Sequence, residues 1–119
     1  MRSSRRLVIV IALALAGCGS DTGDASESQQ CATSVLTYDN FGAPFMLDWC
    51  RGCHSSTLSD GMRQMAPLDV NFDDLDLVRA HASKIALHAT GDRPTMPPAS
   101  GPSAEEREML AEWIACGAK

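Results

Sequence analysis

The segment Cys50-Arg51-Gly52-Cys53-His54 carries the spacing C-x-x-C-H, which occurs once in this chain of 119 residues. Two thiols three positions apart can each form a thioether to one of the two vinyl groups of a porphyrin. The imidazole that follows can then ligate the porphyrin iron from the same side. The segment therefore predicts one covalently attached c-type haem (haem c), with Cys50 and Cys53 as the attachment points and His54 as the proximal ligand.

Two other sites use a similar pair of cysteines, namely half of a zinc site and a thioredoxin-like redox pair. Zinc requires three or four converging ligands, often with a second closely spaced pair, whereas the remaining cysteines of this chain stand alone and far from the motif. A redox pair belongs in a βαβ context of apolar strands and crossover helices, and no such pattern is present. We therefore prefer haem attachment to both alternatives.

The N-terminal residues have the pattern of an export signal. Arg2, Arg5 and Arg6 precede an apolar run from residue 7 to 16, which is too short to span a bilayer and ends at small residues. We expect residues 1–17 to be removed and to take no part in the fold. The mature protein would then occupy an oxidising, exported compartment.

The end of this signal, Leu15-Ala16-Gly17-Cys18, resembles the lipobox of bacterial lipoproteins. The resemblance implies that Cys18 is acylated and becomes the first mature residue, although cleavage nearby or an uncleaved anchor are alternatives. Residues 19–30 hold nothing larger than Ala to bury, so residues 18–30 should form a lipid-anchored, flexible linker. Gly19 after the cysteine, by resemblance to enteric lipoproteins, favours the outer membrane over the inner, with the protein facing the periplasm.

Two further cysteines, Cys31 and Cys116, lie near the ends of the remaining segment, residues 31–119. In an oxidising compartment two such thiols are expected to form a disulfide. A bond closing a loop of this length would stabilise the fold by ~4 to 5 kcal/mol in the chain-entropy account. The alternative is a pair of buried free thiols.

Size and charge limit the fold and the partners. Residues 31–119 make one domain near the lower limit for an independent apolar core, and the chain holds only three Phe, two Trp and one Tyr. A porphyrin would complete such a weak core. Without residues 1–17 the chain has seven Lys and Arg against fifteen Asp and Glu, a formal net charge of minus eight. This excess argues against nucleic acid as a partner and favours weak, salt-sensitive docking to a protein with a basic patch.

Helical periodicity predicts an all-α fold. Apolar spacing predicts a helix over residues 38–49 that leads into the haem motif, with Pro44 in its first turn or at a kink. Residues 54–66 are polar and predict a loop. A stripe of apolar residues predicts a helix over 72–89 with Asp73, Asp74 and Asp76 in its first turn. The capping box Ser103-Ala104-Glu105-Glu106 opens a final helix that Gly117 can end.

Met96 is the candidate for the sixth ligand of the iron. It lies in Pro94-Thr95-Met96-Pro97-Pro98, where the prolines restrict the backbone and hold a thioether without a supporting helix. A thioether stabilises the reduced iron and raises the potential. His81 and His88 on one predicted helix face, Met62 and Met65 in the loop after the motif, and an open site remain alternatives.

Together, the haem motif, Met96-Pro97-Pro98 some forty residues later and a capped last helix resemble a compact class I cytochrome c on a bacterial lipoprotein. The resemblance covers residues 33–118. It implies three to four helices around one haem, with His54 proximal and Met96 distal. The first and last helices cross in that fold, which would bring Cys31 towards Cys116. Many members of the family lack this disulfide.

These expectations combine into a single-haem, lipid-anchored electron carrier rather than an enzyme. Its iron would cycle between Fe(II) and Fe(III), held by His54 and Met96. One alternative is a haem-bearing subunit of a larger membrane-associated oxidoreductase. The other is a sensor or peroxidase with an open site on the iron.

Overall fold

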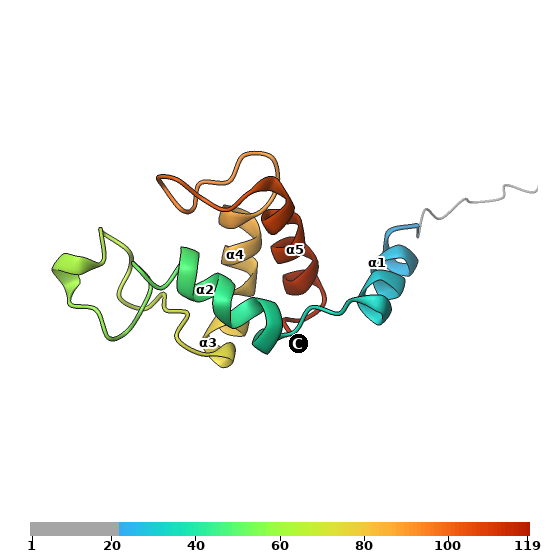
Figure 1. The fold of residues 1–119 in the computed structure, drawn as a ribbon, viewed down its shortest axis with the longest axis horizontal. Helices are drawn as coiled ribbons and strands as arrows, with labels where there is room; N and C mark the ends of the chain where they lie inside the picture. Colours follow the sequence, from blue (N-terminus) through green and yellow to red (C-terminus); the bar gives the residue numbers. More distant parts are fainter. Residues whose placement is uncertain (1–21) are drawn as a thin grey trace, which may run out of the picture.

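The computed structural model describes residues 22–119, and every regular element in this part of the chain is helical (Figure 1). The all-α prediction is therefore confirmed for these residues. The predicted signal, residues 1–17, and the predicted lipidation site, Cys18, lie outside the described residues. The elements in chain order are α1 (Thr22–Thr33), the π-helical turn η1 (Tyr38–Gly42), α2 (Ala43–Trp49), the 3₁₀ turn η2 (Asp60–Met62), α3 (Leu75–Ala80), α4 (Ala82–Ala89) and α5 (Ala104–Ala115).

Helix α1 occupies most of the segment for which we predicted a flexible linker. Residues 25–30 of this helix are all exposed. The lack of large apolar residues correctly indicates that the segment has little to bury, but it does not by itself exclude a helix. Helix α1 contains two Ala, one Glu and two Gln, which are good helix formers even without a buried face.

The predicted helix over residues 38–49 is present as η1 followed directly by α2. Thr37 begins η1 with a capping box, because its hydroxyl accepts from the amide of Asn40 and the Asn40 side chain accepts from the amide of Thr37. Pro44 lies in the first turn of α2. A proline is tolerated there because its missing N–H has no partner within the helix.

The predicted helix over residues 72–89 is divided into α3 and α4. The break is at His81, whose backbone has φ −110° and ψ 12°. Its imidazole Nε2 lies 3.1 Å from the carbonyl oxygen of Asp69, so the ring is held by a contact outside the helices. The predicted apolar stripe is confirmed, since Val78, Ile85 and Ala89 are buried.

Helix α5 begins and ends as predicted. Ser103 accepts from the amide of Glu106, and the Glu106 carboxylate accepts from the amide of Ser103. Gly117 has φ +83°, a left-handed conformation that glycine adopts without a steric penalty. The helix buries Leu110, Trp113 and Ile114.

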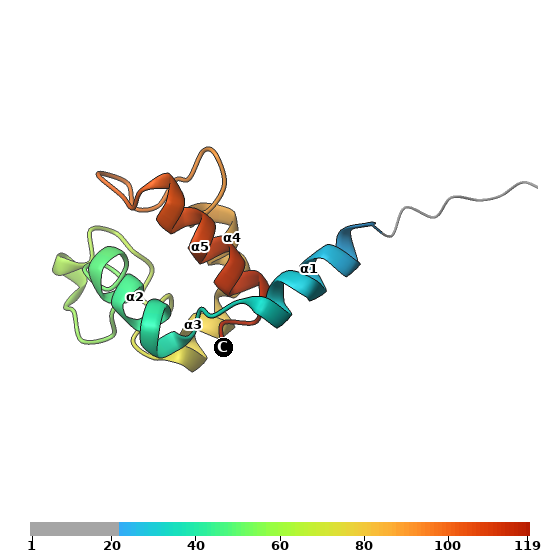
Figure 2. The ribbon, with the colours of Figure 1, turned by 45° about the vertical axis from the view of Figure 1, so that its right-hand side comes forward.

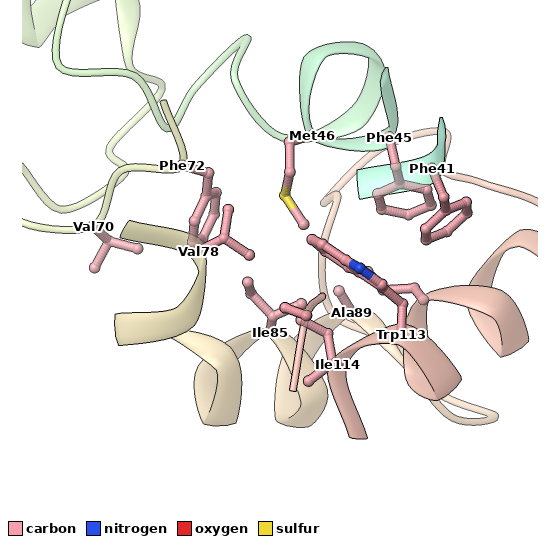
Figure 3. Packing of buried hydrophobic residues seen from close by; sticks show 12 residues of the cluster. Phe41, Phe45, Met46, Val70, Phe72, Val78, Ile85, Ala89, Trp113 and Ile114 are labelled. Carbon is pink, nitrogen blue, oxygen red and sulfur yellow. The ribbon is translucent and has the colours of Figure 1, made fainter. Parts of the chain in front are cut away.

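Trp113 lies at the centre of the core, 1% exposed, between aromatic residues of η1 and α2 and aliphatic residues of α4 (Figure 3). Its ring meets that of Phe41 edge-on, with centroids 6.0 Å apart. Gly42 lies directly against the Trp113 indole, so that a Cβ at position 42 would overlap the ring. The segment η1 therefore approaches α5 as closely as a backbone without a side chain allows.

The first and last described segments are tied together at the end of α5. The structure contains the predicted disulfide between Cys31 and Cys116, with an S–S distance of 2.00 Å and a Cα–Cα distance of 5.2 Å. The amide of Tyr38 donates to the carbonyl of Lys119, and the Lys119 ammonium donates to the carbonyl of Cys31 at 3.1 Å. Among the helices described between residues 22 and 119, none has the length and apolar character needed to cross a bilayer.

Candidate functional site

The residues of the C-x-x-C-H motif form a continuous turn at the end of α2. The amide of Cys50 donates to Met46 as the last helical hydrogen bond, and the amides of Cys53 and His54 both donate to the carbonyl of Cys50, at 3.2 and 2.9 Å. The two thiols are half-buried and unpaired. Burial raises the pKa of the Cys50 thiol to about 12. The motif is therefore a single local unit in which neither thiol takes part in a disulfide.

The imidazole of His54 is held in one orientation. Its Nδ1 lies 3.1 Å from the carbonyl oxygen of Val70, which can only accept, so Nδ1 carries the proton and donates. Nε2 then keeps its lone pair. Burial lowers the pKa of His54, and the charges of Arg63 and His81 lower it further, whereas the hydrogen bond to Val70 raises it. This is the arrangement that a metal-ligating imidazole adopts, with its second ring nitrogen donating to a carbonyl.

The ring of His54 is also packed from the side. Phe72 lies 5.0 Å away between ring centroids, and its amide donates to the carbonyl of His54 at 3.0 Å. Val70 and Phe72 thus approach His54 from the same segment, and Figure 3 shows both as members of the buried cluster. This segment fixes the imidazole by contacts that have no counterpart in the sequence motif.

Arg63 holds the loop after the motif together. The residue is 1% exposed, and its guanidinium donates to the carbonyls of Ser55, Pro67 and Val70 and to the Asn71 side chain. Sequence reasoning missed both Arg63 and the Val70 carbonyl. A single arginine in a polar loop has no distinguishing pattern, and every residue has a carbonyl.

Asp73 joins the segment after His54 to the start of α3. Its carboxylate accepts from the hydroxyl of Ser55 at 2.5 Å and from the amide of Ser56 at 2.7 Å, and lies 3.5 Å from the guanidinium of Arg51. Burial would raise the pKa of Asp73, but these two hydrogen bonds and the Arg51 charge lower it to about 2. The prediction that Asp73 lies in the first turn of a helix is wrong, because Asp74 caps α3 by accepting from Leu77.

Met96 lies on a different loop, between α4 and α5. The amides of Thr95 and Met96 both donate to the carbonyl of His88, at 2.8 and 2.9 Å, and the bond between Met96 and Pro97 is cis. The side chain is 43% exposed. Figures 1 and 2 both show this loop apart from the loop that follows the motif. The structure therefore brings Cys50, Cys53 and His54 together and leaves Met96 on a separate segment.

The alternative ligands are distributed around these two loops. The rings of His81 and His54 both pack against Phe72, and the His81 ring is nearly perpendicular to it. The Nε2 of His81 lies 3.1 Å from the carbonyl oxygen of Asp69. His88 lies in the last turn of α4, next to the Met96 loop, and its Nδ1 is 3.1 Å from the Thr95 hydroxyl. Met62 and Met65, in the loop after the motif, are 62% and 98% exposed.

The described residues fit a covalently attached haem. The unpaired thiols of Cys50 and Cys53 stand beside an imidazole whose Nε2 is available. Several large apolar side chains are exposed, including Leu68 at 65% and Met96, and apolar surface of this kind can be covered by a bound cofactor. Within residues 22–119 there is no cluster of three or more His, Cys, Asp and Glu side chains placed to bind a bare metal ion.

Comparison with known proteins identifies no relative. No family model matches the chain, and no curated protein or solved structure is significantly similar to it.

Proposed function

We propose that this protein is a single-haem electron carrier of the class I cytochrome c type, anchored to the cell envelope by a lipid on Cys18 and facing the periplasm. One observation carries the proposal. The His54 imidazole, in the same turn as two unpaired thiols, donates from Nδ1 to the Val70 carbonyl and so keeps Nε2 available for iron.

Each residue of the site has a separate task. The thiols of Cys50 and Cys53 would hold the porphyrin by thioethers, and His54 would ligate the iron from the side fixed by Val70 and Phe72. Met96, on a loop stiffened by prolines, would supply the opposite thioether ligand. When bound, the haem supplies a one-electron exchange between Fe(II) and Fe(III), and no substrate bond is made or broken.

The charge of the chain supports docking to a basic partner. Without residues 1–17 the formal net charge is minus eight, and charge complementarity speeds the encounter of redox partners in a way that salt weakens. Such a partner could also be permanent, in which case the protein would be the haem-bearing subunit of a larger oxidoreductase. Co-purification of a dehydrogenase would distinguish this case from a free carrier.

Attachment of haem is tested on protein matured in a host that attaches haem to apoproteins. We expect the mature mass to include one porphyrin, and the pyridine haemochrome spectrum to be that of haem bound through two thioethers. Cys50→Ala should lose one thioether and Cys50→Ala/Cys53→Ala should lose covalent haem. Ser59→Ala, in the exposed part of the following loop, should keep both. A mature wild-type protein without haem would refute the proposal.

The distal ligand is tested on the oxidised protein. We expect a methionine-to-ferric-iron band in the wild type, its loss in Met96→Ala, and its retention in Met65→Ala, which removes the most exposed methionine of residues 22–119. Retention of the band in Met96→Ala would show that Met96 is not the ligand.

A second candidate function, a haem sensor or peroxidase, is favoured by the exposure of Met96 and by its place on a separate loop. It predicts that the wild-type protein lacks the methionine band and binds cyanide or carbon monoxide readily. The electron carrier, whose iron would be held by both His54 and Met96, should bind these ligands only slowly.

A further inference from the structure

The guanidinium of Arg63 is a buried positive charge whose hydrogen-bond acceptors are all neutral. It donates to the carbonyls of Ser55, Ala66, Pro67 and Val70 and to the Asn71 amide oxygen, at 2.5 to 3.4 Å. In the part of the chain that the structure describes, the only ion pair joins two other residues, Arg51 and Asp73. The hydrogen bonds of Arg63 are thus satisfied while its charge is not neutralised by a carboxylate.

Such a burial is costly and is uncommon without a paired acid. Carbonyl dipoles compensate part of the cost, because they point their negative ends at the cation. An apolar side chain could fill the same space only if these carbonyls found other donors. A charge retained in this position acts on its surroundings more strongly than a surface charge, since it is screened less by water and salt.

One of the acceptors links Arg63 directly to the candidate site. The carbonyl oxygen of Val70 lies 3.1 Å from Nη2 of Arg63 and also 3.1 Å from Nδ1 of His54. The same oxygen therefore receives two donors. Arg63 therefore holds in place the carbonyl that receives the His54 proton.

We propose that Arg63 is a positioning residue that sets the redox balance of the site. It aligns the Val70 carbonyl that orients His54, and its uncompensated charge favours the less positive, Fe(II) state over Fe(III). The charge acts on the iron through space, whereas the alignment of the Val70 carbonyl keeps the Nδ1 proton of His54 hydrogen-bonded and protected from solvent. The inference rests on the proposed function, since it concerns the iron that His54 would ligate.

The test compares three variants of the haem-loaded protein. Arg63→Gln removes the charge and keeps a donor, Arg63→Lys keeps the charge and loses the planar fork of donors, and Lys84→Gln removes an exposed charge from α4 as a control. The reduction potential is measured by spectroelectrochemistry at fixed ionic strength. The exchange rate of the His54 Nδ1 proton with solvent is measured by NMR in the reduced protein.

For Arg63→Gln we expect the equilibrium between Fe(II) and Fe(III) to shift about tenfold towards Fe(III), which lowers the reduction potential by ~59 mV for a one-electron couple. We also expect the Nδ1 proton of His54 to exchange faster, because the Val70 carbonyl is no longer held in place. Arg63→Lys should stay closer to the wild-type potential but exchange that proton faster. Lys84→Gln should change neither the equilibrium between Fe(II) and Fe(III) nor the exchange rate of the Nδ1 proton by more than about twofold, because the charge of Lys84 is exposed and screened.

Two results would overturn the inference. The first is an Arg63→Gln protein, folded by circular dichroism, whose potential matches that of Lys84→Gln. The second, which decides the matter if Arg63→Gln does not fold, is an Arg63→Lys protein in which exchange of the Nδ1 proton is unchanged. A wild-type protein without haem would instead refute the proposed function, and this inference with it.

Discussion

The contact between Gly42 and Trp113 predicts that a substitution which usually stabilises a helix will here destabilise the protein. Gly42 has helical backbone angles, φ −60° and ψ −53°. Alanine at an exposed position with these angles would stabilise a helix by about 1 kcal/mol. In this structure the added Cβ would overlap the six-membered ring of the Trp113 indole.

The indole cannot easily move aside. It is 1% exposed, its Nε1 donates to the carbonyl of Lys119 at 3.2 Å, and Phe41 and Tyr38 pack against it. Overpacking of a core by one methyl group costs about 1 to 3 kcal/mol, and an overlap with a fixed ring belongs at the upper end of this range. After subtraction of the helix gain, we expect Gly42→Ala to lower the free energy of unfolding by about 2 kcal/mol.

The measurement is urea unfolding of the haem-loaded protein followed by far-ultraviolet circular dichroism. The slope of the unfolding free energy against urea concentration is compared between variants. Gly61→Ala is the matched control, because a Cβ at position 61 meets no atom within 4 Å, and it should stay within about 0.5 kcal/mol of the wild type. Trp113→Phe in the same protein should reduce the cost of Gly42→Ala, since the overlapping ring atoms are removed. A Gly42→Ala protein as stable as the wild type would refute the predicted overlap.

Three further predictions concern stability. Replacing Cys31 and Cys116 together by serine opens a loop of 85 residues and should lower the free energy of unfolding in urea by about 4 to 5 kcal/mol; a loss below about 1 kcal/mol would contradict the chain-entropy account. Asp73 has a pKa lowered from 3.8 to about 2, so its charge stabilises the fold above pH 3.8 and this contribution is lost as the pH falls towards 2. Asp73→Asn should therefore show a smaller fall in melting temperature than the wild type over that interval, and an identical fall would count against the Ser55 and Ser56 hydrogen bonds. Ser103→Ala removes the N-cap of α5 and should lower the free energy of unfolding, measured by thermal unfolding, by about 1 kcal/mol. The same change at Ser100, which is exposed and caps no helix, should have little effect.

The local elements followed closely from the sequence. The capping box at Ser103 and the glycine at 117 marked both ends of α5, because caps and left-handed glycines act within a few residues of the helix end. The apolar stripe of residues 75–89 was also correct, although the helix itself is broken. His81 interrupts it through contacts with Asp69 and Phe72, which lie on a neighbouring segment and leave no mark on the periodicity.

The candidate site was only partly predictable. Cys50, Cys53 and His54 are adjacent in the chain, so their proximity needs no tertiary structure. The residues that orient His54 and hold the following loop together, Val70 and Arg63 above all, come from 9 to 16 positions away and act largely through hydrogen bonds to carbonyls. Whether Met96 ligates the iron stays a prediction.

The sequence by itself therefore determined the helices, their caps, the thiol and imidazole spacing and the pairing expected of the two remaining cysteines, because each depends on residue type and short-range order. Only the tertiary structure decided where η1 meets α5, where the α3–α4 helix breaks and which carbonyl receives the His54 proton. The physical reason is that backbone carbonyls are chemically identical along the chain and a glycine has no side chain. Their roles are set only by what the fold places against them.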